Sequence, residues 1–377
     1  MGRQRIVVKI GSSSLTETNG SLSLEKLTEH VGALAELKKQ GHDVILISSG
    51  AVAAGFPSLG YPSRPVTLAG KQAAAAVGQG LLMQGYTEQF APYSLTPAQL
   101  LLTRDDFSDH TRFGNANRAI TELLKRGCIP IINENDSTSV DELTFGDNDL
   151  LSALVVGFVH ADMLIILTDV NGIYSDNPLK NPDAMKYSHI PEITSELLAL
   201  SGESGTTVGT GGMKSKISAA QTALSLGVNS FIGKGEGHAK LVSILSGEGD
   251  GTYLGSFSHK PVMPTSKQWI SLHSQTVGSI VIDEGAEHAL LQKGKSLLPA
   301  GVVSVRGIFS AQEVIQVCNA KGFLLGKGRT NLSSEEISLV KGLDSTKARE
   351  ITNHSRKEII HRDQWVAANR KEQTNNE

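Results

Sequence analysis

Apolar residues along the chain fall into short runs, and longer segments with helical spacing separate these runs. The runs are rich in Val, Ile and Leu and do not alternate with polar residues; they are RIVVKI (5–10), DVILIS (43–48), CIPIIN (128–133), MLIILT (163–168) and NSFIG (229–233). Such runs are typical of strands that are buried on both faces of a parallel sheet.

The segment between the first two runs has the pattern of an amphipathic helix. Its apolar residues recur every three or four positions, at Leu24, Leu27, Val31, Leu34 and Leu37. Ser23 can cap the start of this helix, and Gly41 can end it. The alternation of strands and helices up to about residue 258 predicts an α/β fold in which helices sandwich an open, mostly parallel sheet.

The pattern changes after HKPVMPTSKQ (259–268), a segment with two prolines that is typical of a linker. Beyond it, short alternating strands are broken by glycines, as in a small β-barrel. The end of the chain is polar and finishes in KEQTNNE. We predict a first domain over residues 1–258, a linker over 259–274, a small barrel-like domain over 275–352 and a C-terminal tail over 353–377.

Four of the predicted strands are followed by small or polar residues. The segments are GSSS, SGAVAAG, NENDSTS and TDVNG. In open α/β sheets, ligands bind beyond the carboxyl ends of the strands. Four such segments at one edge of a sheet favour a binding site over a set of ordinary turns.

The stretch GTGGMKSK (209–216) has the residues of a phosphate-binding loop but not the spacing of a Walker A motif. Glycines let backbone N–H groups converge on an anion, and Lys214 and Lys216 add positive charge. A helical pattern follows the stretch, so it can also supply the N-terminus of a helix. The same residues fit a flexible linker with solvated lysines. Lys9, at the end of the first run, is either a surface residue or a second charge aimed at the same anion.

A second group of polar residues surrounds the third run and the helix after it. Its members carry carboxylates or amides, and they are Asn133, Asn135, Asp136, Asp147, Asn148 and Asp149. They can bind a metal ion or a substrate ammonium group, or they can orient the lysines. Asp147 or Asn148 can instead simply cap the helix that begins there. Histidine does not accompany the group, so it does not indicate a transition-metal site.

Composition narrows the class of protein. The chain has 377 residues, 39% of them hydrophobic, and a net charge of −3, which gives no basic field for nucleic acid. Two distant cysteines, Cys128 and Cys318, do not form a disulfide framework and fit a reducing compartment. The sequence has neither a signal-peptide pattern nor a run of the ~20 apolar residues that a membrane helix needs. We expect a cytoplasmic protein without membrane contacts.

With these residues in place, the chain resembles the bacterial glutamate 5-kinases of the amino acid kinase family. The matching segments occur in the family's order: VVKIGSSSL, SSGAVAAG, LLTRDDF, INENDS, FGDNDLLSALVV, ILTDVNGIY and GTGGMKSK. The segment IVIDEGAEHALLQKGKSLLPAGV resembles the PUA domain that these enzymes often carry. The resemblance implies the amino acid kinase fold followed by a small β-barrel-like PUA domain.

The resemblance also implies an activity: ATP-dependent phosphorylation of the γ-carboxylate of L-glutamate, the first step of proline biosynthesis. Lys9 would stabilise the transferring phosphoryl group, Lys216 the leaving oxygen, and Asp149 would orient both lysines. Glutamate would be held by Ser49, Asp136, Asn148 and Asn133. The nucleotide would be held by Lys9, Thr168, Asp169, Thr210, Gly211, Gly212, Met213, Lys214, Ser215 and Lys216. Mg²⁺ would arrive with the nucleotide, and the sequence names no protein ligand for it.

The resemblance leaves alternatives open. Another amino acid kinase would act on aspartate, acetylglutamate or carbamate, and a protein with an inactive kinase fold would serve RNA binding or regulation. The family implies a homo-oligomer and functional coupling to glutamyl-phosphate reductase.

From Lys267 onward the chain has 15 Lys and Arg against 12 Asp and Glu, a balance of +3. This balance is too small to support RNA binding by the PUA domain. Lys214 and Ser215 stand where a small residue and a threonine are usual.

Overall fold

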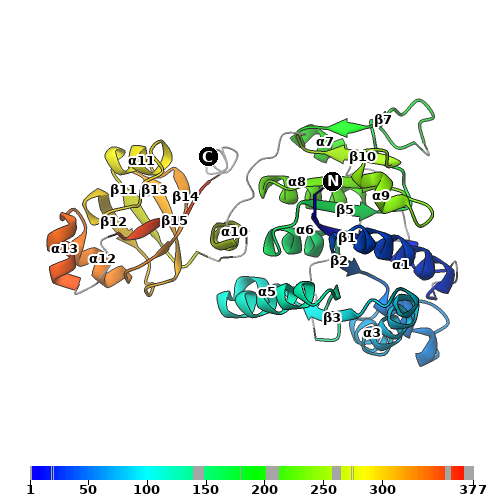
Figure 1. Ribbon diagram of the computed structural model, residues 1–377. Coiled ribbons are helices and arrows are strands. Elements are labelled where there is room, and N and C mark those ends of the chain that lie inside the picture. The colour runs from blue at the N-terminus through cyan, green and yellow to red at the C-terminus, as the bar shows by residue number, and fades with distance from the viewer. Residues whose placement is uncertain are drawn as a thin grey trace. The chain divides into compact units, whose positions relative to one another are not determined.

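The computed structural model describes residues 2–17, 19, 21–138, 148–178, 180–200, 212–256, 265–272, 274, 276–352 and 358–368. The chain divides into two compact units, Met1–Met263 and Pro264–Glu377 (Figure 1). Each unit has its own sheet and its own hydrophobic core.

An eight-stranded sheet forms the centre of the first unit within the described part of the chain. Its order is β3-β4-β2-β1-β5-β9-β10-β8, and every neighbouring pair is parallel except β9 with β10. The strands are β1 (Arg5–Ile10), β2 (Asp43–Ser48), β3 (Pro97–Leu102), β4 (Ile129–Glu134), β5 (Met163–Leu167), β8 (His189–Ile190), β9 (Asn229–Gly233) and β10 (Gly251–Leu254). The predicted mostly parallel α/β sheet is confirmed.

Helices cover both faces of this sheet. One face carries α1 (Leu24–Lys39), α3 (Leu68–Phe90) and α9 (Lys240–Leu245), and the other carries α5 (His110–Lys125), α6 (Asn148–Phe158) and α8 (Met213–Ser225) (Figure 1). The shorter elements are η1 (Ser12–Ser14), α2 (Ala51–Gly55), η2 (Pro57–Leu59), η3 (Ala91–Tyr93), α4 (Arg104–Ser108), α7 (Ser195–Leu200) and the ribbon of β6 (Ile173–Tyr174) with β7 (Lys186–Tyr187).

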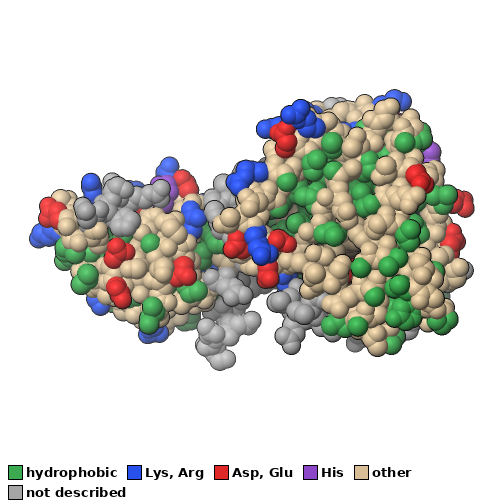
Figure 2. Space-filling view, turned by 90° about the horizontal axis from the view of Figure 1, so that it is seen from below, with side chains coloured by type: hydrophobic (Ala, Val, Ile, Leu, Met, Phe, Trp, Pro, Cys, Tyr) green, Lys and Arg blue, Asp and Glu red, His purple; other side chains and the backbone are tan. Residues whose placement is uncertain are grey.

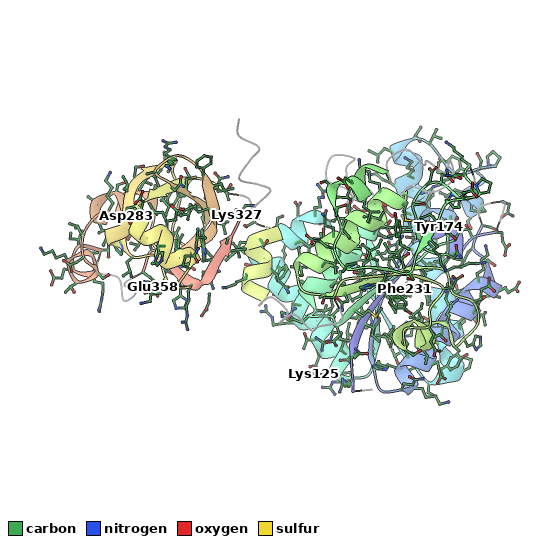
Figure 3. All side chains as sticks on the ribbon, turned by 90° about the horizontal axis from the view of Figure 1, so that it is seen from above. Lys125, Tyr174, Phe231, Asp283, Lys327 and Glu358 are labelled. Carbon is green, nitrogen blue, oxygen red and sulfur yellow. The ribbon has the colours of Figure 1, made fainter. Side chains whose placement is uncertain are left out.

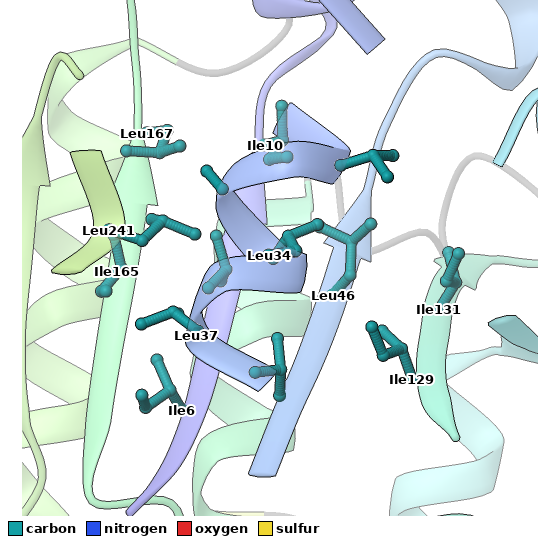
Figure 4. Close-up of a cluster of buried hydrophobic side chains, with 14 of the residues drawn as sticks. Ile6, Ile10, Leu34, Leu37, Leu46, Ile129, Ile131, Ile165, Leu167 and Leu241 are labelled. Atoms are coloured by element: carbon teal, nitrogen blue, oxygen red, sulfur yellow. The ribbon is translucent and has the colours of Figure 1, made fainter. Parts of the chain in front are cut away.

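The main core lies between α1 and the central strands (Figure 4). Leu34 and Leu37 of α1 pack there with Ile6, Ile10 and Leu46 of the strands, and all five side chains are fully buried. Burying a side chain of this size stabilises the fold by roughly 1.5–3 kcal/mol. This core fixes the end of β1, where Lys9 lies, against the rest of the sheet.

The glycines of α2 and α3 allow the two helices to touch backbone to backbone. A Cβ added at Gly55 would lie 1.9 Å from the carbonyl oxygen of Ala74, and one added at Gly78 would lie 1.8 Å from the carbonyl oxygen of Ala51. Only hydrogen at both positions permits this approach. The contact holds α3, and with it Gln79, against the segment that follows β2.

In the described residues of the second unit, five strands form a sheet in the order β12-β11-β13-β14-β15. Its elements are α10 (Thr265–Leu272), β11 (Ser279–Ile282), α11 (Glu284–Leu291), η4 (Pro299–Gly301), β12 (Val302–Arg306), β13 (Val314–Asn319), β14 (Leu324–Thr330), α12 (Ser334–Val340), α13 (Ser345–Thr352) and β15 (Ile360–Ala367). Asp283, labelled in Figure 3, caps α11: its carboxylate accepts a hydrogen bond from the backbone N–H of Ala286 at 2.7 Å.

In the first unit, the ring of Phe231, also labelled in Figure 3, contacts the ring of Tyr253.

Two segments differ from the expected linker and tail. Within the segment expected to be a linker, Thr265–Leu272 forms α10, because Trp269 and Ile270 are apolar and become buried in the second unit. Within the expected tail, Ile360–Ala367 forms β15, because Ile360 and Trp365 join the core of the same unit. Residues 257–264, 353–357 and 369–377 lie outside the described part of the chain.

The glycine contact between α2 and α3 gives a test of the fold. Gly78→Ala forces a methyl group into backbone, and we expect it to lower the free energy of unfolding by about 1–3 kcal/mol, as overpacking does. Gly80→Ala is the matched control, because the same helix leaves open space at Gly80. It should raise stability by about 0.5–1 kcal/mol. Denaturant titration of both variants checks this; equal stability of the two would show that the contact does not constrain the helices.

Candidate active site

Three buried charged side chains meet where β1 ends. Lys9 comes from β1, Asp149 from the first turn of α6, and Lys216 from the first turn of α8 (elements in Figure 1). Lys9 Nζ lies 2.6 Å from Asp149 Oδ1, and Lys216 Nζ lies 3.2 Å from Asp149 Oδ2. The side chain of Asp149 is fully buried, and those of the two lysines are at least nine-tenths buried. One carboxylate therefore bridges two ammonium groups.

The carboxylate of Asp149 stays ionised in this setting. Burial pushes the pKa of Asp149 up, but the charges of Lys9 and Lys216 and the hydrogen bonds from Lys9 and Ser215 outweigh burial and hold the pKa below its ordinary value. The Ser215 hydroxyl donates to Asp149 Oδ2 at 2.7 Å. The cluster of two lysines and one carboxylate keeps a surplus positive charge, which suits an anionic ligand.

The start of α8 places its two lysines differently. Gly212 is the N-cap, and Met213 begins the helix. Lys216 is buried and points to Asp149, whereas Lys214 is exposed. Backbone N–H groups at a helix N-terminus attract anions, so this turn adds to the charge of Lys216. Thr210 and Gly211 lie outside the described residues, as does Asp147.

The segment after β1 is held in place by α1. Lys26 Nζ donates to the carbonyl oxygens of Thr16 at 2.5 Å and Ser13 at 3.3 Å. His30 Nε2 lies 3.0 Å from the carbonyl oxygen of Ser14. Burial lowers the pKa of His30 to about 4, so the ring is neutral and its Nε2 donates to that carbonyl. Neither residue was singled out from the sequence, because a lysine and a histidine on a helix usually mark a solvated face.

A hydrogen-bonded network of amide side chains lies at the ends of β2 and β4. Asn148, at the start of α6, donates from Nδ2 to Ser49 Oγ at 2.9 Å and to the carbonyl of Ser48 at 3.0 Å. The same nitrogen lies 2.8 Å from Asn133 Oδ1, and Asn133 Nδ2 donates to Gln79 Oε1 at 2.9 Å. The structure thus brings together three of the residues expected to hold glutamate.

Gln79 was not found from the sequence. The sequence feature that could have indicated it is one polar residue within AAAAVGQGLLM, a helical segment of small and apolar residues. Behind it on α3, the hydroxyl of Tyr86 hydrogen bonds with Ser48 Oγ at 2.8 Å. Both contacts depend on how α3 packs, which the local pattern does not reveal.

Asp136, the fourth expected glutamate residue, follows β4 and is half-buried. Burial raises the pKa of Asp136, and the charge of Arg64 opposes this only in part. A carboxylate in this state is stabilised by a cation that enters its surroundings.

Thr168 and Asp169 follow β5, on the side of β1 opposite to the amides. Thr168 Oγ1 donates to Asp169 Oδ1 at 3.0 Å, and the Thr168 backbone N–H donates to the carbonyl of Gly233 at the end of β9. Thr168 is buried, and Asp169 is exposed. The strand order therefore separates two groups of residues, one after β2 and β4 and the other after β5 and in α8, with Lys9 between them.

The described residues contain no group of three or more His, Cys, Asp or Glu side chains that could hold a metal ion. None of the helices in the same part of the chain has both the length and the apolar character needed to cross a membrane.

The bridging carboxylate gives a prediction about stability. Asp149→Asn leaves two buried ammonium groups without their counter-charge, and we expect it to lower the free energy of unfolding by about 3–5 kcal/mol. The control is Asp250→Asn, which breaks an exposed ion pair with Lys186 and should cost at most ~1 kcal/mol. Denaturant titration near neutral pH compares the two; equal costs would contradict the bridging role.

The depressed pKa of Asp149 also predicts how the stability difference between the native protein and Asp149→Asn depends on pH. Because the pKa of Asp149 in the folded state lies below its ordinary value of 3.8, its stabilisation is complete above that value. The stabilisation is lost as the pH falls through the folded-state pKa. The difference in stability between the native protein and Asp149→Asn should therefore be constant above about pH 5 and shrink below about pH 4. A difference that grows on acidification would contradict the depressed pKa.

Comparison with known proteins agrees with this geometry. The model of the amino acid kinase family matches residues 4–234, and the model of the PUA domain matches residues 278–352. A protein of Geobacillus thermodenitrificans named glutamate 5-kinase is 59% identical over 97% of this chain and 98% of its own length. One of Bacillus cereus with the same name is 58% identical over 97% of this chain and all of its own.

Likeness to solved structures is weaker. The carbamate kinase of Giardia lamblia bound to AMP-PNP shares 20% identity, with a TM-score of 0.48 over 67% of this chain and 99% of that chain. The family assignment therefore rests on the sequence comparisons, which cover nearly the whole chain at high identity. By its sequence, the chain belongs to the amino acid kinase family.

Proposed function

We propose that this protein is a glutamate 5-kinase, which transfers the γ-phosphoryl group of ATP to the γ-carboxylate of L-glutamate. The products are γ-glutamyl phosphate and ADP, and the reaction is the first step of proline biosynthesis. The observation that carries the proposal is the bridge of Asp149 between Lys9 and Lys216. It lies between one set of residues suited to a small acceptor and another suited to a nucleotide.

The lysines match what phosphoryl transfer requires. Charge spreads over the oxygens of the transferring group, so catalysis is mainly positioning and stabilisation of negative charge. Buried ammonium groups act strongly because little water screens them. Lys9, on the strand between the two sets, would contact the transferring group, and Lys216, beside the start of α8, would contact the leaving oxygen. Asp149 would hold both at fixed positions without quenching their total charge.

The amide side would bind the acceptor. Asp136 would face the α-ammonium group of glutamate, since burial raises the pKa of its carboxyl group and the charge of Arg64 opposes this only in part. Ser49, Asn133 and Asn148 form a connected polar group, and Asn133 precedes Asp136 by three residues along the chain. Such a group orients a polar substrate without adding a competing charge.

The other side would bind ATP. Thr168, Asp169 and the segment from Thr210 to Lys216 would line the nucleotide, with the N-terminus of α8 at its phosphates. Lys216 and the N-terminus of that helix fit a polyphosphate by their charge. Mg²⁺, carried by the nucleotide, would neutralise part of the phosphate charge.

Two other functions compete with this one. A kinase for aspartate, acetylglutamate or carbamate would share the lysines but differ in the acceptor residues; the names of the relatives favour glutamate. An RNA-binding protein with an inactive kinase fold would not need the buried bridge of Lys9, Asp149 and Lys216. On the face seen in Figure 2, Lys and Arg side chains lie among Asp and Glu and do not form one basic surface.

The product suggests partners. An acyl phosphate is a mixed anhydride that water attacks readily, so direct use by glutamyl-phosphate reductase would protect it. We therefore propose functional coupling to that reductase. We also propose a homo-oligomer in solution, as the family implies.

The substrate assignment is tested by trapping the product. Purified protein with Mg²⁺ and ATP is incubated with hydroxylamine, which converts an acyl phosphate into a coloured hydroxamate. We expect hydroxamate and ADP with L-glutamate and little of either with L-aspartate, N-acetyl-L-glutamate or bicarbonate with ammonia. Turnover of one of these three in place of L-glutamate would assign a different acceptor, and RNA retention without ADP release would favour the non-enzymatic alternative.

Steady-state kinetics separate binding from chemistry. Lys9→Met and Lys216→Met remove charge that acts on the moving phosphoryl group, so kcat should fall by roughly 10²–10³, as for loss of one preorganised donor. Lys214→Met should be the least sensitive of the three lysine variants, because Lys214 is exposed in the same helix turn. Asp136→Ala should mainly raise the KM for glutamate, since its contact is similar in ground and transition states. A crippled Lys214→Met with a normal Lys216→Met would overturn these roles.

A further inference from the structure

Gln79 reaches the acceptor side of the site from α3. The helix is held there by the backbone contact of Gly55 and Gly78, the residue just before Gln79. The side chain is more than nine-tenths buried, and its Oε1 accepts from Asn133 Nδ2 at 2.9 Å. Gln79 is thus fixed at both ends, by packing of its helix and by one hydrogen bond.

The orientation of every amide in this network follows from two backbone groups. The Ser48 carbonyl can only accept, so the atom of Asn148 that faces it is the NH₂ nitrogen. The Glu134 N–H can only donate, so the atom of Asn133 that it meets at 2.9 Å is the oxygen. The NH₂ group of Asn133 then faces Gln79, whose own oxygen must accept. This logic leaves the NH₂ group of Gln79 pointing away from Asn133.

Among the described residues, that NH₂ group of Gln79 has no hydrogen-bond acceptor. Its nitrogen, Nε2, is buried. A buried donor without a partner costs free energy, and native proteins usually satisfy such groups with another side chain, water or a ligand. An amide NH₂ group can only donate, so a ligand that meets Gln79 Nε2 must bring an acceptor.

We propose that Gln79 is a specificity-determining residue whose Nε2 donates a hydrogen bond to the α-carboxylate of the acceptor. This inference rests on the proposed function, because it names a contact of that substrate. Gln79 selects an amino acid with two carboxylates over an amine with one.

The strand order distinguishes the two carboxylates of glutamate. The γ-carboxylate must lie near Lys9, at the end of β1, to receive the phosphoryl group. Gln79 bonds to Asn133 at the end of β4, which is separated from β1 by β2. Two strand spacings amount to about 10 Å. The carboxylate at the far end of the substrate is therefore the one that meets Gln79.

The test uses Gln79→Glu, which keeps the acceptor for Asn133 and replaces the donor with a second oxygen. Gln84→Glu is the control, because Gln84 is exposed on the same helix. The wild-type enzyme and both variants are assayed for turnover of L-glutamate. Glutarate, which lacks the ammonium group, and 4-aminobutyrate, which lacks the α-carboxylate, are measured as competitive inhibitors.

We expect Gln79→Glu to lower kcat/KM for L-glutamate by about 10- to 100-fold, the effect of a hydrogen bond to a charged group, chiefly through KM. The inhibition constant of glutarate should rise by a similar factor, whereas that of 4-aminobutyrate should change by no more than about twofold. Gln84→Glu should match the wild type in every measurement.

Other outcomes overturn the inference. An unchanged KM for L-glutamate would show that Gln79 does not touch the substrate. Equal weakening of all three ligands would show a general structural role or contact with the γ-carboxylate, and a loss confined to kcat would place Gln79 in the chemical step. Failure of the wild-type enzyme to phosphorylate L-glutamate would instead defeat the proposed function. In that case, protection against thermal unfolding by glutarate, compared between the wild type and Gln79→Glu, still reports whether Gln79 binds a carboxylate.

Discussion

Two ammonium groups share one fully buried carboxylate, and the arrangement of the first unit depends on that bridge. Lys9 and Lys216 would repel each other across a dry site, and each alone would be costly to bury. Asp149 offsets both costs and leaves a net positive charge. The bridge joins the end of β1 to the first turns of α6 and α8. Any change in the packing of those three elements would therefore move one of these charges.

The strand order gives this charge its direction. Residues suited to the acceptor follow β2 and β4, residues suited to the nucleotide follow β5 and lie in α8, and β1 lies between them. Because neighbouring parallel strands end at the same edge of the sheet, donor and acceptor in the proposed reaction would approach Lys9 from opposite sides. An in-line transfer needs such an approach. In the proposed reaction, the strand order would thus set the direction of transfer.

The sequence predicts the part of this structure that local patterns encode. The runs around β1, β2, β4, β5 and β9 are apolar throughout because both faces are covered, and α1 shows its buried stripe directly. It did not reveal β3, which starts with Pro97 and lies at the sheet edge, where a missing N–H is tolerated. It also missed α10 and β15, because their few apolar residues become informative only when the second unit's core is known.

The residues of the candidate site likewise divide into those that the sequence indicated and those that only the packed structure revealed. Lys9, Asp149 and Lys216 became candidates because Lys9 ends an apolar run, Asp149 belongs to a group of carboxylates and amides, and Lys216 follows a glycine-rich stretch; their separate roles came from the family resemblance. Gln79 and Tyr86 were not candidates, because their position depends on the contact between Gly55 and Gly78, which is a property of two packed helices. The directions of the amides were likewise out of reach, since backbone groups of Ser48 and Glu134 determine them.

The use of amides on the acceptor side has a physical reason. An arginine or lysine there would bind a carboxylate more strongly than Gln79, but its charge would compete with Lys9 and Lys216 for the γ-carboxylate. A substrate bound in reverse would then place the wrong carboxylate at the phosphoryl group. A neutral donor binds a carboxylate only where geometry allows, and in the proposed complex the negative charge of Asp136 would favour the ammonium group. Under this proposal, the charges of the two lysines would drive the transfer, and neutral hydrogen bonds would select which carboxylate receives the phosphoryl group.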